Sequence, residues 1–152
     1  MKTDRRRDRY TLSFVMLMVL NGLFGQAGAA CLQTNLTGTW QAVGVSGNSN
    51  LGGFEEYIRC KIVLNSTGGV VPSLSACIGR DNVGRFTVDI TGGSMRVGTA
   101  CNITGSLTFY AGATLRHIVE FGQMALDKNI FTFTSYQSTN PDLLTVFTAV
   151  KQ

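Results

Sequence analysis

Four cysteines, at positions 31, 60, 77 and 101, and a single histidine, His117, are the residues best suited to carry chemistry. The cysteines form no Cys-x-x-Cys pair, and one histidine cannot complete the usual zinc spacings. We therefore expect no metal site and no cofactor. An even number of cysteines in a chain of 152 residues predicts disulfides, which persist in oxidising, extracytoplasmic compartments.

Two disulfide pairings are compatible with the spacing. Cys60 and Cys77 lie at equal distances from Gly68-Gly69, which is typical of a hairpin tip. Directly opposed residues of an antiparallel pair have Cα atoms about 4.5–5.5 Å apart, within the range of a disulfide. This favours Cys60 with Cys77, leaving Cys31 with Cys101. However, Cys77 shares its predicted face with serines, whereas Cys60 and Cys101 lie on apolar faces, so Cys60 with Cys101 is the alternative.

His117 shares one face of a predicted strand with Leu115 and Val119, so its side chain should point inward. The pattern favours a core histidine; a polar group inside a ligand cavity and a catalytic base are the alternatives. No Gly-x-Ser-x-Gly elbow is present, so no catalytic residue is assigned. Glu55 and Glu56 are adjacent and would point to opposite faces of a strand, so we expect a solvated flanking segment rather than a carboxylate pair.

Residues 1–29 have the three parts of a secretory signal peptide. The basic start contains Arg5-Arg6-Arg7, an apolar run follows at residues 12–20, and the small-residue end allows cleavage after Ala29 or Ala30. The apolar run is shorter than the roughly 20 residues that a membrane helix needs, so no membrane span is expected after signal removal. We predict that the protein is secreted or periplasmic.

The net charge of +4 comes mostly from this leader, which holds five of the 13 Lys and Arg residues and two of the 9 Asp and Glu residues. The rest of the chain is close to neutral. A strongly basic protein would point to nucleic acid or to anionic membranes, but a neutral one does not. Neither is therefore expected as a partner.

Residues 30–152 consist of short runs in which apolar and polar residues alternate, separated by turn residues, with no sustained helical period. About eight to ten such runs predict a single all-β domain, either a small antiparallel barrel or a β-sandwich. Two hairpins are the clearest. Gly92-Gly93 would turn the chain between two apolar strand faces, and a turn at residues 111–113 would set Phe109 opposite Leu115.

Gly38-Thr39-Trp40 opens the first predicted strand and contains the only tryptophan. The motif resembles the Gly-x-Trp that calycin barrels, the lipocalins and avidins, carry near their first strand. The resemblance implies that Trp40 packs inside a barrel, at its base or beside a ligand site. The chain departs from both families elsewhere, because it has no Thr-Asp-Tyr of a lipocalin and no second tryptophan of an avidin-type pocket.

These observations predict a non-catalytic, extracytoplasmic β-domain that acts by binding or by surface assembly. Its partner would be another protein or a small apolar ligand, and self-association through sheet edges is one way to assemble. One alternative is a small-ligand carrier with a cavity near Trp40, His117 and Phe109; another is a small secreted hydrolase using His117. Hydrolase activity would need a nucleophile that the sequence does not single out.

Three Asn-x-Ser/Thr patterns, at Asn35, Asn65 and Asn102, match the acceptor for N-glycosylation. They would carry glycans only in a eukaryotic host. A chain so rich in Asn and Thr also produces such patterns by chance, so they do not decide the host.

Overall fold

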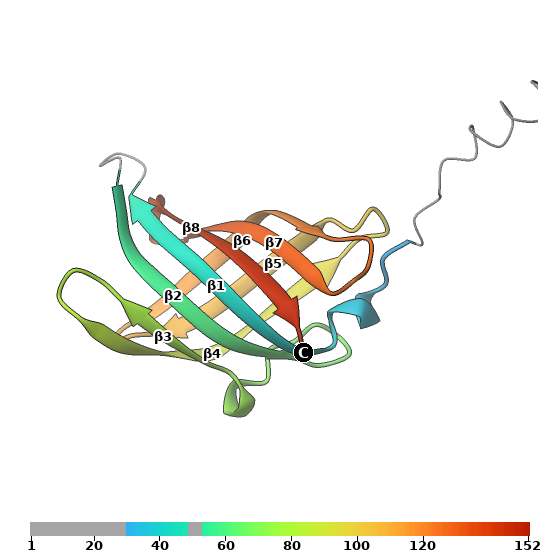
Figure 1. Ribbon diagram of the computed structural model, residues 1–152, viewed down its shortest axis with the longest axis horizontal. Helices are drawn as coiled ribbons and strands as arrows, with labels where there is room; N and C mark the ends of the chain where they lie inside the picture. The colour runs from blue at the N-terminus through green and yellow to red at the C-terminus, as the bar shows by residue number, and fades with distance from the viewer. Residues whose placement is uncertain (1–29, 49–52) are drawn as a thin grey trace, which may run out of the picture.

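In the computed structural model, which describes residues 30–48 and 53–152, eight antiparallel strands form a closed barrel (Figure 1). Each strand pairs with the next along the chain, and β1 pairs with β8 to close the ring. The all-β prediction is confirmed, and the choice between barrel and sandwich is decided for the barrel. The elements, in chain order, are η1 (Gln33–Leu36), β1 (Gly38–Asn48), β2 (Gly53–Leu64), η2 (Pro72–Leu74), β3 (Ala76–Arg80), β4 (Arg85–Val97), β5 (Ile103–Tyr110), β6 (Thr114–Met124), β7 (Ile130–Gln137) and β8 (Asn140–Lys151).

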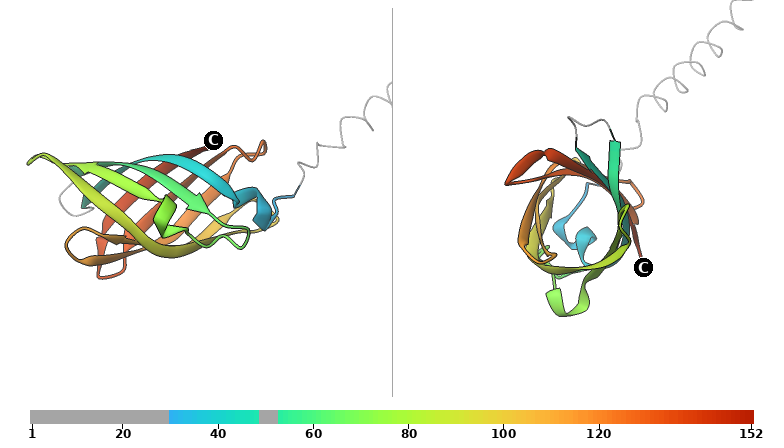
Figure 2. Two further views of the ribbon diagram at one scale, coloured as in Figure 1. Left: turned by 90° about the horizontal axis from the view of Figure 1, so that it is seen from below. Right: turned by 90° about the vertical axis from the view of Figure 1, so that its left-hand side faces the viewer.

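The interior of the barrel is apolar, and η1 covers one of its ends. Alternation along each strand turns one face of the sheet inward, and the inward face is mostly apolar. The short 3-10 helix η1 lies across one end, which we call the base, and it is visible inside the ring of strands when the barrel is viewed along its length (Figure 2). The opposite end carries the β3–β4, β5–β6 and β7–β8 turns, and we call it the mouth.

Trp40 on β1 is fully buried in the base, so it packs inside the barrel as the Gly-x-Trp resemblance implies. Its Nε1 donates a hydrogen bond to the carbonyl oxygen of Leu36 at 2.7 Å, which ties η1 to β1. Its ring meets Phe131 edge-on, with centroids 4.5 Å apart. Lys151 places its Nζ 5.4 Å from the centroid of the Trp40 ring and donates to the carbonyl oxygen of Asn35 at 3.0 Å.

Strand β4 corrects one prediction, because Gly92-Gly93 does not turn the chain. The strand continues through both glycines and pairs with β5 on either side of them, with a register shift between Ile90 and Gly92. Gly93 has a φ of 118°, and a Cβ there would lie 2.3 Å from the carbonyl oxygen of Ser106. The bulge therefore lies at Thr91, immediately before the glycine pair, and Gly93 allows the β5 backbone to approach closely where the strand bends.

The second predicted hairpin is confirmed. β5 and β6 are joined by a turn at residues 111–113, and they pair Phe109 with Leu115 and Leu107 with His117. Two of the side chains predicted to contact a ligand, Phe109 and His117, therefore lie on neighbouring strands.

The preferred disulfide pairing is also confirmed. Cys60 and Cys77 are directly opposed across β2 and β3 and form a disulfide. The alternative pairing was considered because Cys77 shares its face with serines. These serines lie opposite no residue of β2, because the β2–β3 pairing ends one residue pair beyond the cysteines. Ser75 instead accepts a hydrogen bond from the amide of Val63 and donates one to the carbonyl oxygen of Val71.

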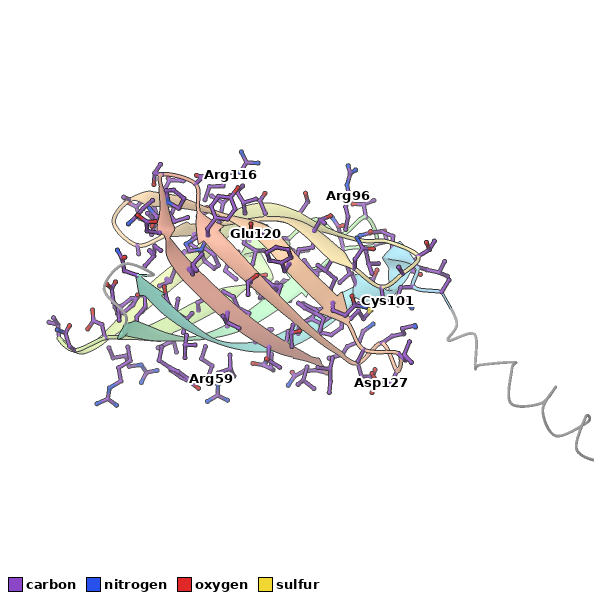
Figure 3. The ribbon with its side chains drawn as sticks, turned by 90° about the horizontal axis from the view of Figure 1, so that it is seen from above. Arg59, Arg96, Cys101, Arg116, Glu120 and Asp127 are labelled. Carbon is purple, nitrogen blue, oxygen red and sulfur yellow. A yellow bond between two sulfur atoms is a disulfide. The ribbon has the colours of Figure 1, made fainter. Side chains whose placement is uncertain are left out.

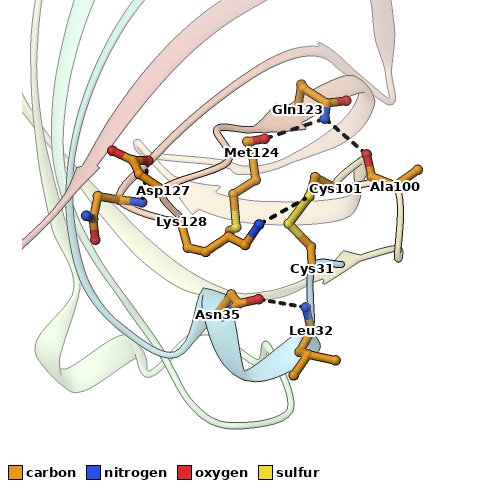
Figure 4. Close-up of a disulfide and its surroundings, with 10 residues drawn as sticks. Cys31, Leu32, Asn35, Ala100, Cys101, Gln123, Met124, Asp127 and Lys128 are labelled. Atoms are coloured by element: carbon orange, nitrogen blue, oxygen red, sulfur yellow. Dashed lines mark hydrogen bonds between the residues drawn. A yellow bond between two sulfur atoms is a disulfide. The ribbon is translucent and has the colours of Figure 1, made fainter. Parts of the chain in front are cut away.

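The second disulfide joins Cys31, which precedes η1, to Cys101, which precedes β5 (Figure 4). Close by, Lys128 Nζ donates to Cys101 Sγ at 3.8 Å, and Gln123 Nε2 donates to the carbonyl oxygen of Ala100 at 3.1 Å. These contacts attach the segment before η1 to the turns that surround the base. Together the two disulfides indicate an oxidising, extracytoplasmic environment.

Within the described ranges, no helix has both the length and the apolar character needed to cross a membrane. The predicted signal peptide, residues 1–29, lies outside these ranges. Its cleavage after Ala29 or Ala30 therefore stays a prediction.

Candidate ligand-binding site

Five polar side chains enter the mouth half of the barrel from five neighbouring strands. They are Glu56 on β2, Ser46 on β1, Thr145 on β8, Ser135 on β7 and His117 on β6. Ser46 lies opposite both Glu56 and Thr145, and Thr145 lies opposite Ser135, so four of them form a continuous row across the sheet. We call the five side chains the polar row.

Four members of the polar row are buried: Ser46, Ser135, Thr145 and His117. Among these four, a single hydrogen bond joins two side chains, from the Thr145 hydroxyl to the Ser46 Oγ at 3.2 Å. The Ser135 Oγ and the His117 Nδ1 are buried without a hydrogen-bond partner in the described residues. A buried polar atom without a partner costs about 1–3 kcal/mol, so two of them in one part of a barrel call for an explanation.

Glu56 is the charged member of the polar row. Burial raises the pKa of its carboxyl above 4.5, the negative charges of Asp81 and Glu55 act in the same direction, and a hydrogen bond with Ser46 acts against them. Glu56 lies two residues before Ile58 on β2, so the two side chains share a face of the strand. Because Ile58 is buried, this is the inner face. The expectation that Glu56 belongs to a solvated flanking loop is therefore wrong.

His117 is held in the wall as a neutral imidazole. Only 6% of its surface is exposed, and burial lowers its pKa from 6.5 to about 4. Phe109 on the adjacent strand packs edge-to-face against it, with ring centroids 5.2 Å apart and an angle of 88°. A neutral imidazole has one nitrogen that donates and one that accepts, so His117 can serve a ligand in either role.

A cavity of about 50 Å³ lies inside the mouth, next to the polar row. Its walls are largely aromatic and aliphatic, and three members of the polar row reach it. The lining consists of Glu56, Ile58, Phe86, Val88, Phe109, Ala111, Leu115, His117, Thr145 and Phe147. The cavity is smaller than most small-molecule sites, but its lining has their usual composition, mainly apolar with a few converging polar groups.

A wider hollow of about 590 Å³, which we call the vestibule, adjoins this cavity. Glu56 and Leu115 line both spaces, so the cavity lies next to the inner side of the vestibule. The remaining lining residues of the vestibule are Glu55, Asp81, Asn82 and Leu143. Three carboxyl groups, those of Glu55, Glu56 and Asp81, therefore border the space next to the cavity.

The structure brings together two of the three residues predicted to contact a ligand. His117 and Phe109 both line the cavity, whereas Trp40 is packed in the base and is not part of the lining. The other four members of the polar row were not predicted from the sequence. The signal for Glu56 was its spacing of two and four residues from Ile58 and Cys60, which places it on their face of the strand.

The described residues contain no group of three or more His, Cys, Asp or Glu side chains placed to hold a metal ion. The His117 Nδ1 has no hydrogen-bond partner, so no carboxylate orients the ring through that atom as in a catalytic triad. Nothing in this geometry favours the hydrolase alternative.

A groove also lies on the outer wall, over β5, β6, β7 and β8. Phe121 lines it with 70% of its surface exposed, and Gly122 and Val146 also belong to the lining. Neither of the two unpartnered buried polar atoms belongs to a residue that lines this groove. It therefore lacks the feature that marks the cavity in the mouth.

Comparison with known proteins gives no family. No family model matches the chain, and no curated protein matches it. The solved structure of a redesigned β-barrel is similar in shape, with a TM-score of 0.49 and 18% identity over 79% of this chain and 94% of that chain.

Proposed function

We propose that this protein is an extracytoplasmic, non-catalytic binding domain that takes a small ligand into the mouth of its barrel. The observation that carries the proposal is the pairing of a cavity with a buried polar group that lacks a hydrogen-bond partner. His117 lines the cavity, its Nδ1 is unpaired, and its ring is neutral near pH 7. A ligand with a polar end would supply the missing hydrogen bond.

The contrast between the two halves of the barrel supports this proposal. In the base, large apolar side chains such as Trp40, Phe131 and Met124 are fully buried, so the chain can fill its interior without polar groups. In the mouth, positions on the same inner faces carry Ser46, Thr145 and the other members of the polar row. Since apolar residues of similar volume would avoid the desolvation cost, stability alone does not account for the polar row.

Surface assembly through sheet edges has less support in this fold. Each of the eight described strands has a neighbour on both sides, because the β1–β8 pairing closes the ring. An edge could therefore pair with another chain only if the barrel opened. Assembly through faces would leave the mouth cavity unexplained.

The test is a titration of the mature protein, labelled with ¹⁵N, with 1-hexanol and with n-hexylamine, followed by two-dimensional NMR. We expect saturable shifts of amide signals on β5, β6 and β8 near the mouth. The variant Val88→Phe fills the cavity from within, and Ala111→Trp obstructs its rim; both should abolish the saturable shifts. Ala113→Trp, on the same turn but outside the lining, is the matched control and should bind as the wild type does.

The proposal is wrong if neither probe gives saturable shifts, or if Val88→Phe and Ala111→Trp bind as well as the wild type. The melting transition of each variant shows that it is folded, so a loss of binding is read only from folded proteins.

A further inference from the structure

We propose that the ligand of the mouth cavity carries an ammonium group on a slim apolar body. This inference rests on the proposed function and specifies the chemical class that the cavity selects. Three features support it: the sign of the charges at the mouth, the hydrogen-bonding capacity of the polar row, and the size of the cavity.

The charged groups that line the mouth have one sign. Glu56 faces both cavity and vestibule, and Glu55 and Asp81 line the vestibule, while neither lining contains a lysine or an arginine. Asp81 accepts hydrogen bonds from the amides of Val83 and Gly84, which lower the pKa of its carboxyl, so it remains ionised. A cation gains from these charges on entering, and an anion is repelled.

The arginines of the barrel lie elsewhere. Arg59, Arg96 and Arg116 project from the outer wall, away from the interior (Figure 3). Arg80 and Arg85 line a separate hollow on the outside of β2, β3 and β4, together with Arg59. No basic side chain of the described residues therefore stands in the cavity to receive a ligand carboxylate or phosphate.

The hydrogen-bonding capacity of the polar row complements an ammonium group. An ammonium group has only donors, and it needs acceptors around it. The Glu56 carboxylate, the hydroxyl oxygen of Thr145 and the unprotonated nitrogen of the neutral His117 are acceptors that line the cavity. A carboxylate ligand would have to accept hydrogen bonds beside Glu56, where the negative charges oppose it.

The size of the cavity limits the apolar part. One water-sized probe occupies roughly 10–15 Å³, so a cavity of about 50 Å³ accepts an unbranched chain of a few carbons more readily than a fused ring system. Phe86, Phe109 and Phe147 supply apolar walls for such a chain. Larger parts of a ligand would remain in the vestibule.

The experiment compares three probes of equal length: n-hexylamine, 1-hexanol and hexanoate, titrated at pH 7 by NMR or calorimetry. We expect n-hexylamine to bind at least about tenfold more tightly than 1-hexanol, because it forms a charge-assisted hydrogen bond, and hexanoate to bind most weakly. The variant Glu56→Gln keeps the shape of the side chain and removes its charge. It should reduce the affinity for n-hexylamine to about that for 1-hexanol, and leave the affinity for 1-hexanol unchanged.

The matched control is Glu120→Gln, which removes the same charge from the exposed outer face of β6 and should change no affinity (Figure 3). Equal binding of n-hexylamine and 1-hexanol by the wild type, or an unchanged preference in Glu56→Gln, would overturn the ammonium assignment and leave the proposed function standing. The absence of saturable binding by every probe would overturn both.

Discussion

At the scale of single residues, the mouth of the barrel is defined by polar atoms held where the rest of the interior is apolar. His117 shows this most clearly, because its ring packs against Phe109 and its Nδ1 has no partner. Burial keeps the imidazole neutral and so makes one ring nitrogen available as an acceptor. The same burial has a measurable consequence for stability.

Because of His117, the protein should become less stable as the pH is lowered. Its pKa is about 4 in the folded protein, against 6.5 for the ordinary side chain, so below pH 6.5 the unfolded chain binds a proton that the folded one does not. We expect the free energy of unfolding to drop by about 2 kcal/mol from this group between pH 7.5 and pH 5. Urea unfolding of the wild type and of His117→Leu at both pH values measures the difference.

The comparison with His117→Leu isolates the histidine, since Glu56, whose pKa is raised, contributes with the opposite sign in both proteins. The variant should lose less stability than the wild type on acidification. Parallel losses in the two proteins would show that His117 titrates normally.

At the scale of elements, the bulge in β4 allows a strand of 13 residues to curve around the barrel. The two glycines that follow the bulge, Gly92 and Gly93, differ in how closely they approach β5. Gly93 has a positive φ and lies against the β5 backbone, whereas a Cβ at Gly92 would meet nothing within 4 Å. Only one of the two positions therefore requires glycine.

Gly93→Ala should destabilise the protein strongly, by about 2 kcal/mol or more, because the added Cβ meets the carbonyl oxygen of Ser106 and φ is unfavourable. Gly92→Ala should be tolerated, with a change within about 0.5 kcal/mol. Thermal or urea unfolding of the two variants tests this directly. A similar loss of stability in both would contradict the assignment of the close approach between β4 and β5 to Gly93.

Features that depend on residues close together in the chain, such as tight turns and the strand pairs beside them, could be predicted from the sequence. The turn at residues 111–113 fixed the register of β5 with β6, and the symmetric placement of Cys60 and Cys77 about Gly68-Gly69 identified their disulfide. Gly92-Gly93 was misinterpreted because glycines occur where a strand bends beside a bulge or approaches another backbone closely, as well as in turns.

The site was harder to predict because it depends on contacts distant in sequence. The polar row arises when β8 pairs with β1, which brings Thr145 beside Ser46, and no turn chemistry encodes that pairing. The choice of a barrel depends on the same closure. Alternation alone places Glu56 and His117 on inner faces, but it does not reveal that they line one cavity.

At the scale of the whole molecule, the two disulfides act on different parts of the barrel. Cys60–Cys77 joins adjacent strands, with a sequence separation of 17. Cys31–Cys101 has a separation of 70 and attaches the segment before η1 to the barrel. Since η1 covers Trp40, the second disulfide holds the base closed.

Removing each disulfide should therefore give a different result. Loss of Cys31–Cys101 by alanine substitution should cost about 4 kcal/mol, against about 3 kcal/mol for Cys60–Cys77, in the chain-entropy model. It should also shift the emission of Trp40, the only tryptophan, towards the red, because η1 is no longer anchored. The Cys60→Ala/Cys77→Ala variant should keep the wild-type spectrum. Identical spectra for the two variants would show that the base does not depend on Cys31–Cys101.

Intermolecular NOEs give the location of a bound probe, and so test whether the mouth cavity holds a small ligand. With n-hexylamine or 1-hexanol bound, we expect NOEs from the methylene protons of the probe to the ring protons of Phe109 and Phe147, which line the cavity. NOEs confined to Phe121 and Val146, on the outer groove, would contradict it.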